Sequence, residues 1–106
     1  MDKETEQKIA QLQLLEQNLQ GFLMQKQQFQ TQLVEVESAL EEIKDAEESF
    51  KIVGSIMVKA KKQDLEKDLK EKKEMLELRI KTIEKQEKNI KDRAEIIQKE
   101  VLGKVK

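Results

Sequence analysis

The side chains that could do chemistry in this chain are almost all carboxylates and lysines. The 106 residues include 22 Asp and Glu and 21 Lys and Arg, but no His and no Cys. Without His, the chain lacks the usual general base and the commonest metal ligand. Without Cys, it has no thiolate nucleophile, no disulfide and no Cys-based metal site. The composition therefore predicts no cofactor and no bound metal ion.

Paired carboxylates are the remaining candidates for acid–base chemistry. Glu41 and Glu42 are adjacent in the sequence, as are Glu47 and Glu48. Glycosidase-type chemistry needs two opposed carboxylates on either side of a cleft, and two helices packed along each other offer none. The three glycines are isolated, so no Gly-rich phosphate loop is present either. We interpret the carboxylate pairs as solvated helix faces and expect that the chain is not an enzyme.

A basic run follows the middle of the chain and comprises Lys59, Lys61, Lys62, Lys67, Lys70, Lys72 and Lys73. Nucleic-acid binding is one hypothesis for such a run. However, five acidic residues interleave with it, and no aromatic side chain is available there for base stacking. Residues 1–50 carry four basic against eleven acidic side chains, and residues 51–106 carry 17 against 11. The two halves neutralise each other when they pack, so we expect no nucleic-acid partner.

No membrane contact is expected. No apolar run approaches the roughly 18 residues that a transmembrane helix needs. The N-terminal Met1-Asp2-Lys3-Glu4 is acidic and polar, unlike a secretory signal peptide. The predicted location is the cytoplasm.

Long helices must position these side chains, because 41% of the residues are charged and proline is absent. One helix is predicted over residues 2–48, with Asp2 as its N-cap. A second is predicted over residues 64–102, with Gln63 or Asp64 as its cap and Gly103 as its stop. Apolar residues at alternating spacings of three and four form a heptad seam on each helix. The seams are Leu12, Leu15, Leu19, Phe22, Lys26, Phe29, Leu33, Val36, Leu40 and Ile43, and Leu69, Lys73, Leu76, Ile80, Ile83, Glu87, Ile90, Ala94, Ile97 and Val101.

The two seams fit together in an antiparallel coiled coil. When Leu33 faces Leu76, the other seam residues of the two helices also face each other in pairs. The midpoint between the two antiparallel helices, the fold axis, then lies at Gly54-Ser55. Registers shifted by one heptad put the axis near residue 51 or 58 instead. The polar seam members Lys26, Lys73 and Glu87 then face apolar partners. We interpret them as side chains that reach out to solvent and help to specify the register.

The residues around Gly54-Ser55 predict a β-hairpin over about residues 50–60. Gly followed by Ser between two β-branched runs is typical of a type II′ turn. One face of the hairpin carries Lys51, Val53, Ile56 and Val58, and the other carries Phe50, Ile52, Met57 and Lys59. An isolated two-stranded hairpin is marginal in water, so we expect hairpins from several chains to form a shared sheet or barrel. The alternative is that the hairpin folds back on its own helices.

This arrangement resembles a subunit of the prefoldin family. The resemblance rests on the run from Phe50 to Val58 between two helices of similar length, with Ala39-Leu40-Glu41-Glu42-Ile43 before it and Leu69 and the run from Arg79 to Gln86 after it. About fifteen residues between the helices leave room for one hairpin, which is similar to the β-class subunit, whereas α-class subunits carry two. Phe50 stands where a Tyr would be expected in that class.

The resemblance implies a fold, a function and partners. The fold is mainly α, a long antiparallel two-helix coiled coil joined by one central β-hairpin that assembles into an intersubunit β-barrel, in one domain of residues 1–106. Family members are hexamers of two α-class and four β-class subunits. Their coiled-coil tips hold unfolded client proteins without nucleotide and pass them to a group II chaperonin. A structural scaffold or adaptor with one defined protein partner and no chaperone activity is the alternative function.

Two sets of site residues follow. The subunit-assembly set is Phe50, Ile52, Val53, Gly54, Ile56, Met57 and Val58. The set expected to bind unfolded proteins is Ile9, Leu12, Leu14, Leu15, Val101, Leu102 and Val105, at the two chain ends. Leu12 and Leu15 also belong to the seam, so packing within the coiled coil is the alternative interpretation for them.

Overall fold

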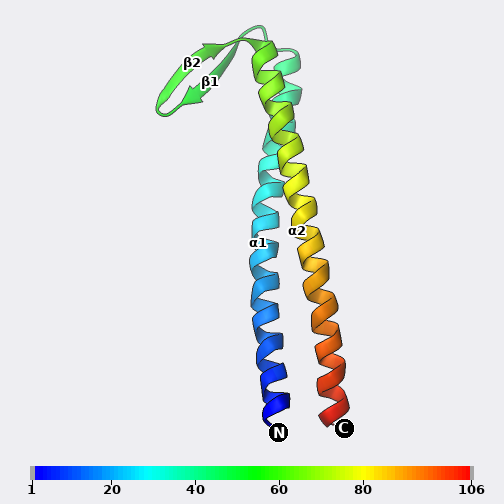
Figure 1. Cartoon of the computed structure of the whole chain (residues 1–106). Helices are drawn as coiled ribbons and strands as arrows, with labels where there is room; N and C mark the ends of the chain where they lie inside the picture. Colours follow the sequence, from blue (N-terminus) through cyan, green and yellow to red (C-terminus); the bar gives the residue numbers. More distant parts are fainter. Residues whose placement is uncertain (1, 106) are drawn as a thin grey trace. The chain divides into compact units, whose positions relative to one another are not determined.

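Two long helices and one β-hairpin form the described part of the chain (Figure 1). The computed structural model describes residues 2–105, with side chains for residues 2–103. In chain order the elements are α1 (Lys3–Lys44), β1 (Ser49–Val53), β2 (Ile56–Ala60) and α2 (Lys62–Val105). They contribute to two compact units, residues 2–27 with residues 81–105, here called the terminal unit, and Gln28–Ile80, here called the hairpin unit. The predicted fold class, two helices with a central hairpin, is confirmed.

Helix α1 begins at the predicted cap. The backbone N–H of Thr5 donates a hydrogen bond to Oδ1 of Asp2 at 2.7 Å, and the N–H of Glu6 donates to the Asp2 carbonyl at 3.1 Å. The helix ends at Lys44, four residues before the predicted end near residue 48. The ammonium group of Lys62 donates to the carbonyl oxygen of Lys44 at 2.5 Å. This bond satisfies one of the carbonyls that a helix C-terminus leaves without an intrahelical partner.

Helix α2 begins two residues before Asp64, so Asp64 lies in its first turn rather than at its cap. Its carboxylate there is near the positive end of the helix dipole. The prediction that Gly103 stops the helix is wrong, because α2 continues to Val105. A glycine ends a helix by adopting positive φ, and among residues 2–105 only Gly54 does so. A helical glycine costs only about 1 kcal/mol relative to Ala, which need not break the helix.

The predicted heptad seams form the interior of both units. Every predicted seam residue is buried or half-buried, and Leu76, with 1% of its surface exposed, is the most deeply buried of them. In the terminal unit the same spacing continues toward the start of α1 through half-buried Lys8 to Thr5, which is 2% exposed. In the hairpin unit the Arg79 guanidinium lies 5.6 Å from the centre of the Phe29 ring. The helical period therefore located the interior residues correctly.

The hairpin has the predicted register, with Val53 opposite Ile56 and Ile52 opposite Met57. Gly54 adopts a φ of 62°, and no other residue among 2–105 has positive φ, as a type II′ turn requires. At the base of the hairpin, the Ser49 hydroxyl donates to the Ala60 carbonyl at 2.7 Å. Within the hairpin unit, β1 and β2 project to one side of the helices and do not fold back on them (Figure 1).

Candidate functional site

The hairpin presents apolar side chains to solvent on both of its faces. Ile52 and Met57 are 71% and 65% exposed on one face, and Val53 and Ile56 are 56% and 62% exposed on the other. Phe50 and Val58, the remaining large apolar members of the predicted assembly set, are also exposed. Fully burying such a side chain contributes about 1.5–3 kcal/mol. A hairpin with two exposed apolar faces is therefore a strong candidate for an interaction surface.

A hollow at the base of the hairpin extends this surface onto the helices of the hairpin unit. Its volume is about 390 Å³, and its lining consists of Ala39, Glu42, Ile43, Ala46, Ser49, Phe50, Leu65 and Leu69. Phe50 belongs both to the hairpin face and to the wall of the hollow. The Phe50 face of the hairpin and the hollow are therefore adjacent surfaces. The alternation of side chains along the two strands did not predict the hollow.

The terminal unit divides the residues that were predicted to bind unfolded proteins. Leu14 and Leu102 are each 58% exposed, whereas Leu15 is 7% exposed and packs in the seam. Ile9, Leu12 and Val101 are half-buried. The side chain of Val105 lies outside the described residues. Leu14 and Leu102 are thus the members of that set with the most surface available for a partner.

A second hollow lies along the terminal unit, where the first part of α1 and the last part of α2 run side by side (Figure 1). Its volume is about 410 Å³, and it is lined by Leu12, Leu15, Glu16, Leu19, Ile90, Lys91, Ala94, Glu95 and Gln98. Ala94 is the smallest of the twenty seam residues, and it leaves space beside the longer side chains around it. A small residue at a seam position is the signal in the sequence for this hollow, and the heptad spacing alone does not reveal it.

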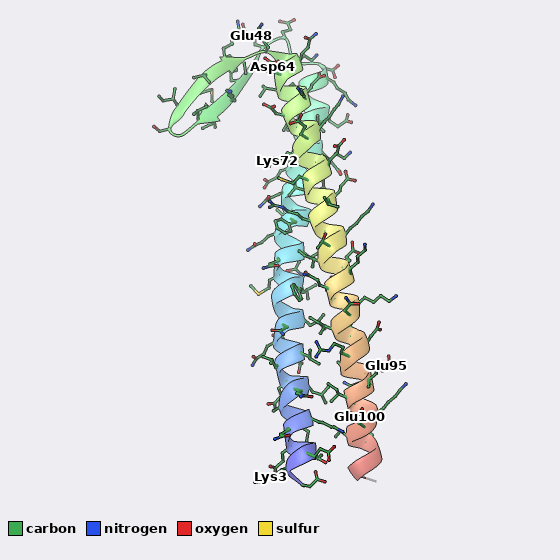
Figure 2. All side chains as sticks on the ribbon, in the orientation of Figure 1. Lys3, Glu48, Asp64, Lys72, Glu95 and Glu100 are labelled. Carbon is green, nitrogen blue, oxygen red and sulfur yellow. The ribbon has the colours of Figure 1, made fainter. Side chains whose placement is uncertain are left out.

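Two ion pairs join the helices of the terminal unit. The Lys26 ammonium lies 2.8 Å from Oε1 of Glu87, and the two side chains are 20% and 8% exposed. The expected register placed each of them opposite an apolar residue and did not predict that they pair. The second pair joins the Lys8 ammonium to the Glu100 carboxylate at 2.9 Å. Figure 2 shows Glu100 on the last turns of α2.

Lys8 also has a shifted acidity. The pKa of its ammonium is raised above 10.5, mainly because the group donates a hydrogen bond to the Glu100 carboxylate and is attracted by its charge. The Glu4 carboxylate, 3.5 Å away, acts in the same direction, while partial burial opposes the shift. The charged form of Lys8 is therefore the form that holds the ends of the two helices together.

The described residues form exposed apolar surfaces and ion pairs between the helices. Within residues 2–105, no group of three or more acidic side chains is placed to hold a metal ion. No helix in that range combines the length and the apolar composition needed to cross a membrane. The carboxylates Glu41 and Glu42 are both exposed, as the interpretation of solvated faces predicts.

Comparison with known proteins places this architecture in a family. The sequence profile described as Prefoldin subunit matches residues 6–106. Over 88 residues the chain is 44% identical to the prefoldin subunit beta of Archaeoglobus fulgidus, and the aligned region covers 80% of this chain and 76% of that protein. Over 101 residues it is 35% identical to the prefoldin subunit beta of Saccharolobus islandicus, covering 92% and 80%.

A solved structure agrees with these sequence matches. The crystal structure of the prefoldin beta subunit from Thermococcus strain KS-1 matches with a TM-score of 0.90 and 31% sequence identity, covering 96% of this chain and 92% of that one. The fold, the single hairpin and the sequence matches therefore agree with one another. The chain belongs to the prefoldin family of chaperone subunits, which form hetero-oligomeric complexes, and within that family it is a β-type subunit.

Proposed function

We propose that this chain assembles through its hairpin with prefoldin α-class subunits and further β-type chains, and that the complex holds unfolded proteins without ATP. The expected complex is a hexamer of two α-class and four β-class subunits around a shared β-barrel. It passes its clients to a group II chaperonin and is not an enzyme. The observation that carries this proposal is the hairpin, which is apolar and exposed on both faces. A plain scaffold would need only a polar loop between its helices.

Assembly through the hairpin is tested by placing charge on both of its faces. The variant Ile52→Asp with Ile56→Asp puts one carboxylate on each face, at positions that are 71% and 62% exposed in the single chain. Burying an unpaired carboxylate in a shared sheet is costly, so the complex should dissociate while its helix content persists. Light scattering coupled to size exclusion measures the mass. An unchanged mass for this variant would refute assembly through the hairpin.

The matched control carries the same two charges on the helices of the hairpin unit. Val34 and Leu78 are 62% and 65% exposed, so Val34→Asp with Leu78→Asp adds the same charge at apolar positions of comparable exposure. This control should keep the mass of the wild-type complex. If both variants dissociate equally, added charge rather than the hairpin explains the effect.

Holding is tested with a chemically unfolded protein that is diluted into buffer without nucleotide. The chain, mixed with an α-class partner, should suppress the rise in light scattering that reports aggregation. Exposed apolar groups at helix ends can bind apolar segments of varied sequence. If the assembled complex gives no suppression, the chaperone function is wrong for this chain and the scaffold alternative is favoured.

The place of client binding is tested separately from assembly. The variant Leu14→Ser with Leu102→Ser removes two leucines of the terminal unit that are each 58% exposed. It should keep the mass of the complex and weaken suppression of aggregation. The control Val34→Ser with Leu78→Ser removes as many exposed apolar side chains from the hairpin unit. Equal weakening by both variants would show that clients bind along the helices and not at the terminal unit.

A further inference from the structure

The oxidisable side chains of this protein are its methionines. The 106 residues include four Met but no Cys, Trp, Tyr or His. Peroxides oxidise the sulfur atoms of Cys and Met, and only Met sulfur is present in this chain. Oxidation of the chain by a peroxide therefore takes place at thioethers.

The three methionines with described side chains are all accessible in the single chain. Met24, Met57 and Met75 are 64%, 65% and 43% exposed. Met24 lies on α1, Met75 on α2 and Met57 on β2. Susceptibility to oxidation follows exposure, so a dissolved oxidant can reach each of these sulfur atoms. Only the sulfur of Met57 belongs to the hairpin.

Met57 lies in the middle of one apolar face of the hairpin. It stands opposite Ile52, one pair away from the pair that flanks the turn. In a hairpin with a two-residue turn this second pair is not hydrogen-bonded, and its two side chains lie close together. Ile52 is 71% exposed, and Phe50 on the same face is 49% exposed. A partner that covers this face must therefore cover the Met57 thioether as well.

We propose that Met57 is an oxidation site, at which a hydroperoxide converts the free chain into a form that does not assemble. This inference rests on the proposed assembly through the hairpin and names a chemical control of it. The sulfur lone pair attacks the terminal peroxide oxygen, so that an S–O bond forms as the O–O bond breaks. The thioether loses two electrons and becomes a sulfoxide. The peroxide gains them, and its departing oxygen takes up the proton and leaves as water or, from an alkyl hydroperoxide, as the alcohol.

The sulfoxide changes the centre of the apolar face. A flexible apolar side chain becomes polar, with an oxygen that accepts hydrogen bonds from water in the free chain. Apolar side chains of a partner would displace that water and supply no donor. A polar group buried without a hydrogen bond weakens association about tenfold to a hundredfold. Sulfoxides at Met24 and Met75 lie on exposed helix surface and keep their water.

The same contact restricts the oxidation to free chains. Once a partner covers Met57, a dissolved oxidant no longer reaches its sulfur, so assembled subunits are protected. Sulfoxide reductases return methionine sulfoxide to methionine, which makes the block reversible. Oxidation therefore delays the assembly of new subunits and leaves existing complexes intact.

The proposal is tested with the full chain, hydrogen peroxide and an α-class partner. The chain is oxidised alone, the peroxide is removed with catalase, and peptide mass spectrometry measures the gain of one oxygen atom at each methionine. The chain is then mixed with the partner, and light scattering coupled to size exclusion follows assembly over a dilution series. The oxidised wild type should need a concentration about ten to a hundred times higher to assemble. Treatment with sulfoxide reductases for both sulfoxide epimers should restore assembly.

Three variants identify the sulfur that is responsible. Met57→Leu keeps an apolar side chain without a thioether, so it should assemble equally well before and after peroxide. The matched control Met24→Leu with Met75→Leu keeps Met57 and should stay as sensitive as the wild type. Met57→Gln carries a polar amide at this position and should assemble weakly without any peroxide. Circular dichroism verifies that every variant keeps its helices.

Protection by assembly is measured on the complex itself. When peroxide is added after assembly, Met57 should gain oxygen more slowly than in the free chain, whereas Met24 should react at a similar rate in both. Equal rates for Met57 in the complex and in the free chain would show that assembly leaves its sulfur uncovered and would overturn the proposal.

The outcomes separate this proposal from the proposed function. Normal assembly of a chain shown to carry the Met57 sulfoxide, or loss of assembly by peroxide-treated Met57→Leu, would overturn the role of Met57. So would a free chain in which Met24 is oxidised and Met57 is not. If oxidation has no effect but Ile52→Asp with Ile56→Asp still dissociates the complex, assembly through the hairpin stands without this inference. If neither oxidation nor the aspartates change the mass, both proposals fail.

Discussion

Breaking the ion pair of the terminal unit should have unequal effects, depending on which partner is removed. The Lys26 ammonium and the Glu87 carboxylate lie 2.8 Å apart, but Glu87 is 8% exposed and Lys26 is 20% exposed. In Lys26→Leu, the carboxylate is left almost fully buried without its countercharge. In Glu87→Leu, the ammonium is left on a flexible stem that can extend to water. Removal of Lys26 should therefore cost more stability than removal of Glu87.

The size of each effect follows from the burial of the group left behind. Removing one partner of a buried pair costs about 3–5 kcal/mol, and the lower end of that range suits Lys26→Leu, because Glu87 keeps some contact with solvent. For Glu87→Leu we expect about 1 kcal/mol. Replacing both by Leu completes an apolar seam and should leave stability within about 1 kcal/mol of the wild type. The two single losses sum to about 4 kcal/mol, so the coupling between the two positions is about 4 kcal/mol when the double variant is as stable as the wild type.

Urea unfolding followed by far-UV circular dichroism measures these differences. Protein concentration must be the same for all four chains, because assembly changes apparent stability by mass action. Equal losses of stability in the two single variants, or a loss in the double variant equal to the sum of the two single losses, would contradict this expectation. Either result would mean that the difference in burial between the two side chains does not decide the cost.

Four further changes have defined outcomes. Glu100 raises the pKa of Lys8 above 10.5, so the stability that the charged Lys8 adds is complete below that pH and is lost as pH rises through the raised value. Lys8→Met should therefore have a lower midpoint temperature of thermal unfolding than the wild type at about pH 9. The difference between the two midpoints should shrink by about pH 12. Gly54→Ala should destabilise the hairpin by about 1–2 kcal/mol because its φ is 62°, which weakens assembly about tenfold in a dilution series. By contrast, Gly21→Ala in α1 meets no atom within 4 Å and should add about 1 kcal/mol in urea unfolding. Asp2→Ala should cost about 1 kcal/mol locally and speed amide exchange in the first turn of α1.

The elements that the sequence predicted correctly depend on local patterns. Apolar residues at alternating spacings of three and four, such as Leu33 and Val36, identify the buried face of a helix whatever its register with the partner helix. The turn at Gly54 and the pairing of Val53 with Ile56 follow from turn chemistry over four residues. Helix ends depend on contacts from elsewhere in the chain. Lys62, distant in sequence, caps the end of α1, and no local signal at residues 44–48 announces that bond.

The candidate site was predictable to the extent that exposure follows from the heptad. Leu14 lies off the seam and is exposed, while the adjacent Leu15 lies on it and is buried. The pairing of Lys26 with Glu87 was not predictable from residues that face each other, because long side chains reach the next turn of the partner helix. The hollow beside Ala94 depends on the packing of two helices in three dimensions, which the spacing of apolar residues does not describe.

The exposed hairpin has a consequence for the life of the chain before assembly. A newly made subunit displays Ile52, Met57 and their neighbours on two strands without a covering layer. If the complex holds unfolded proteins as proposed, surfaces of this kind are what it binds, and a surplus subunit should itself be held as a client by complexes that are already complete. The cell would then tolerate unequal synthesis of the subunits only up to the free capacity of its own chaperone. The proportion in which the subunits are made would therefore determine how many uncovered hairpins the cell has to keep from aggregating.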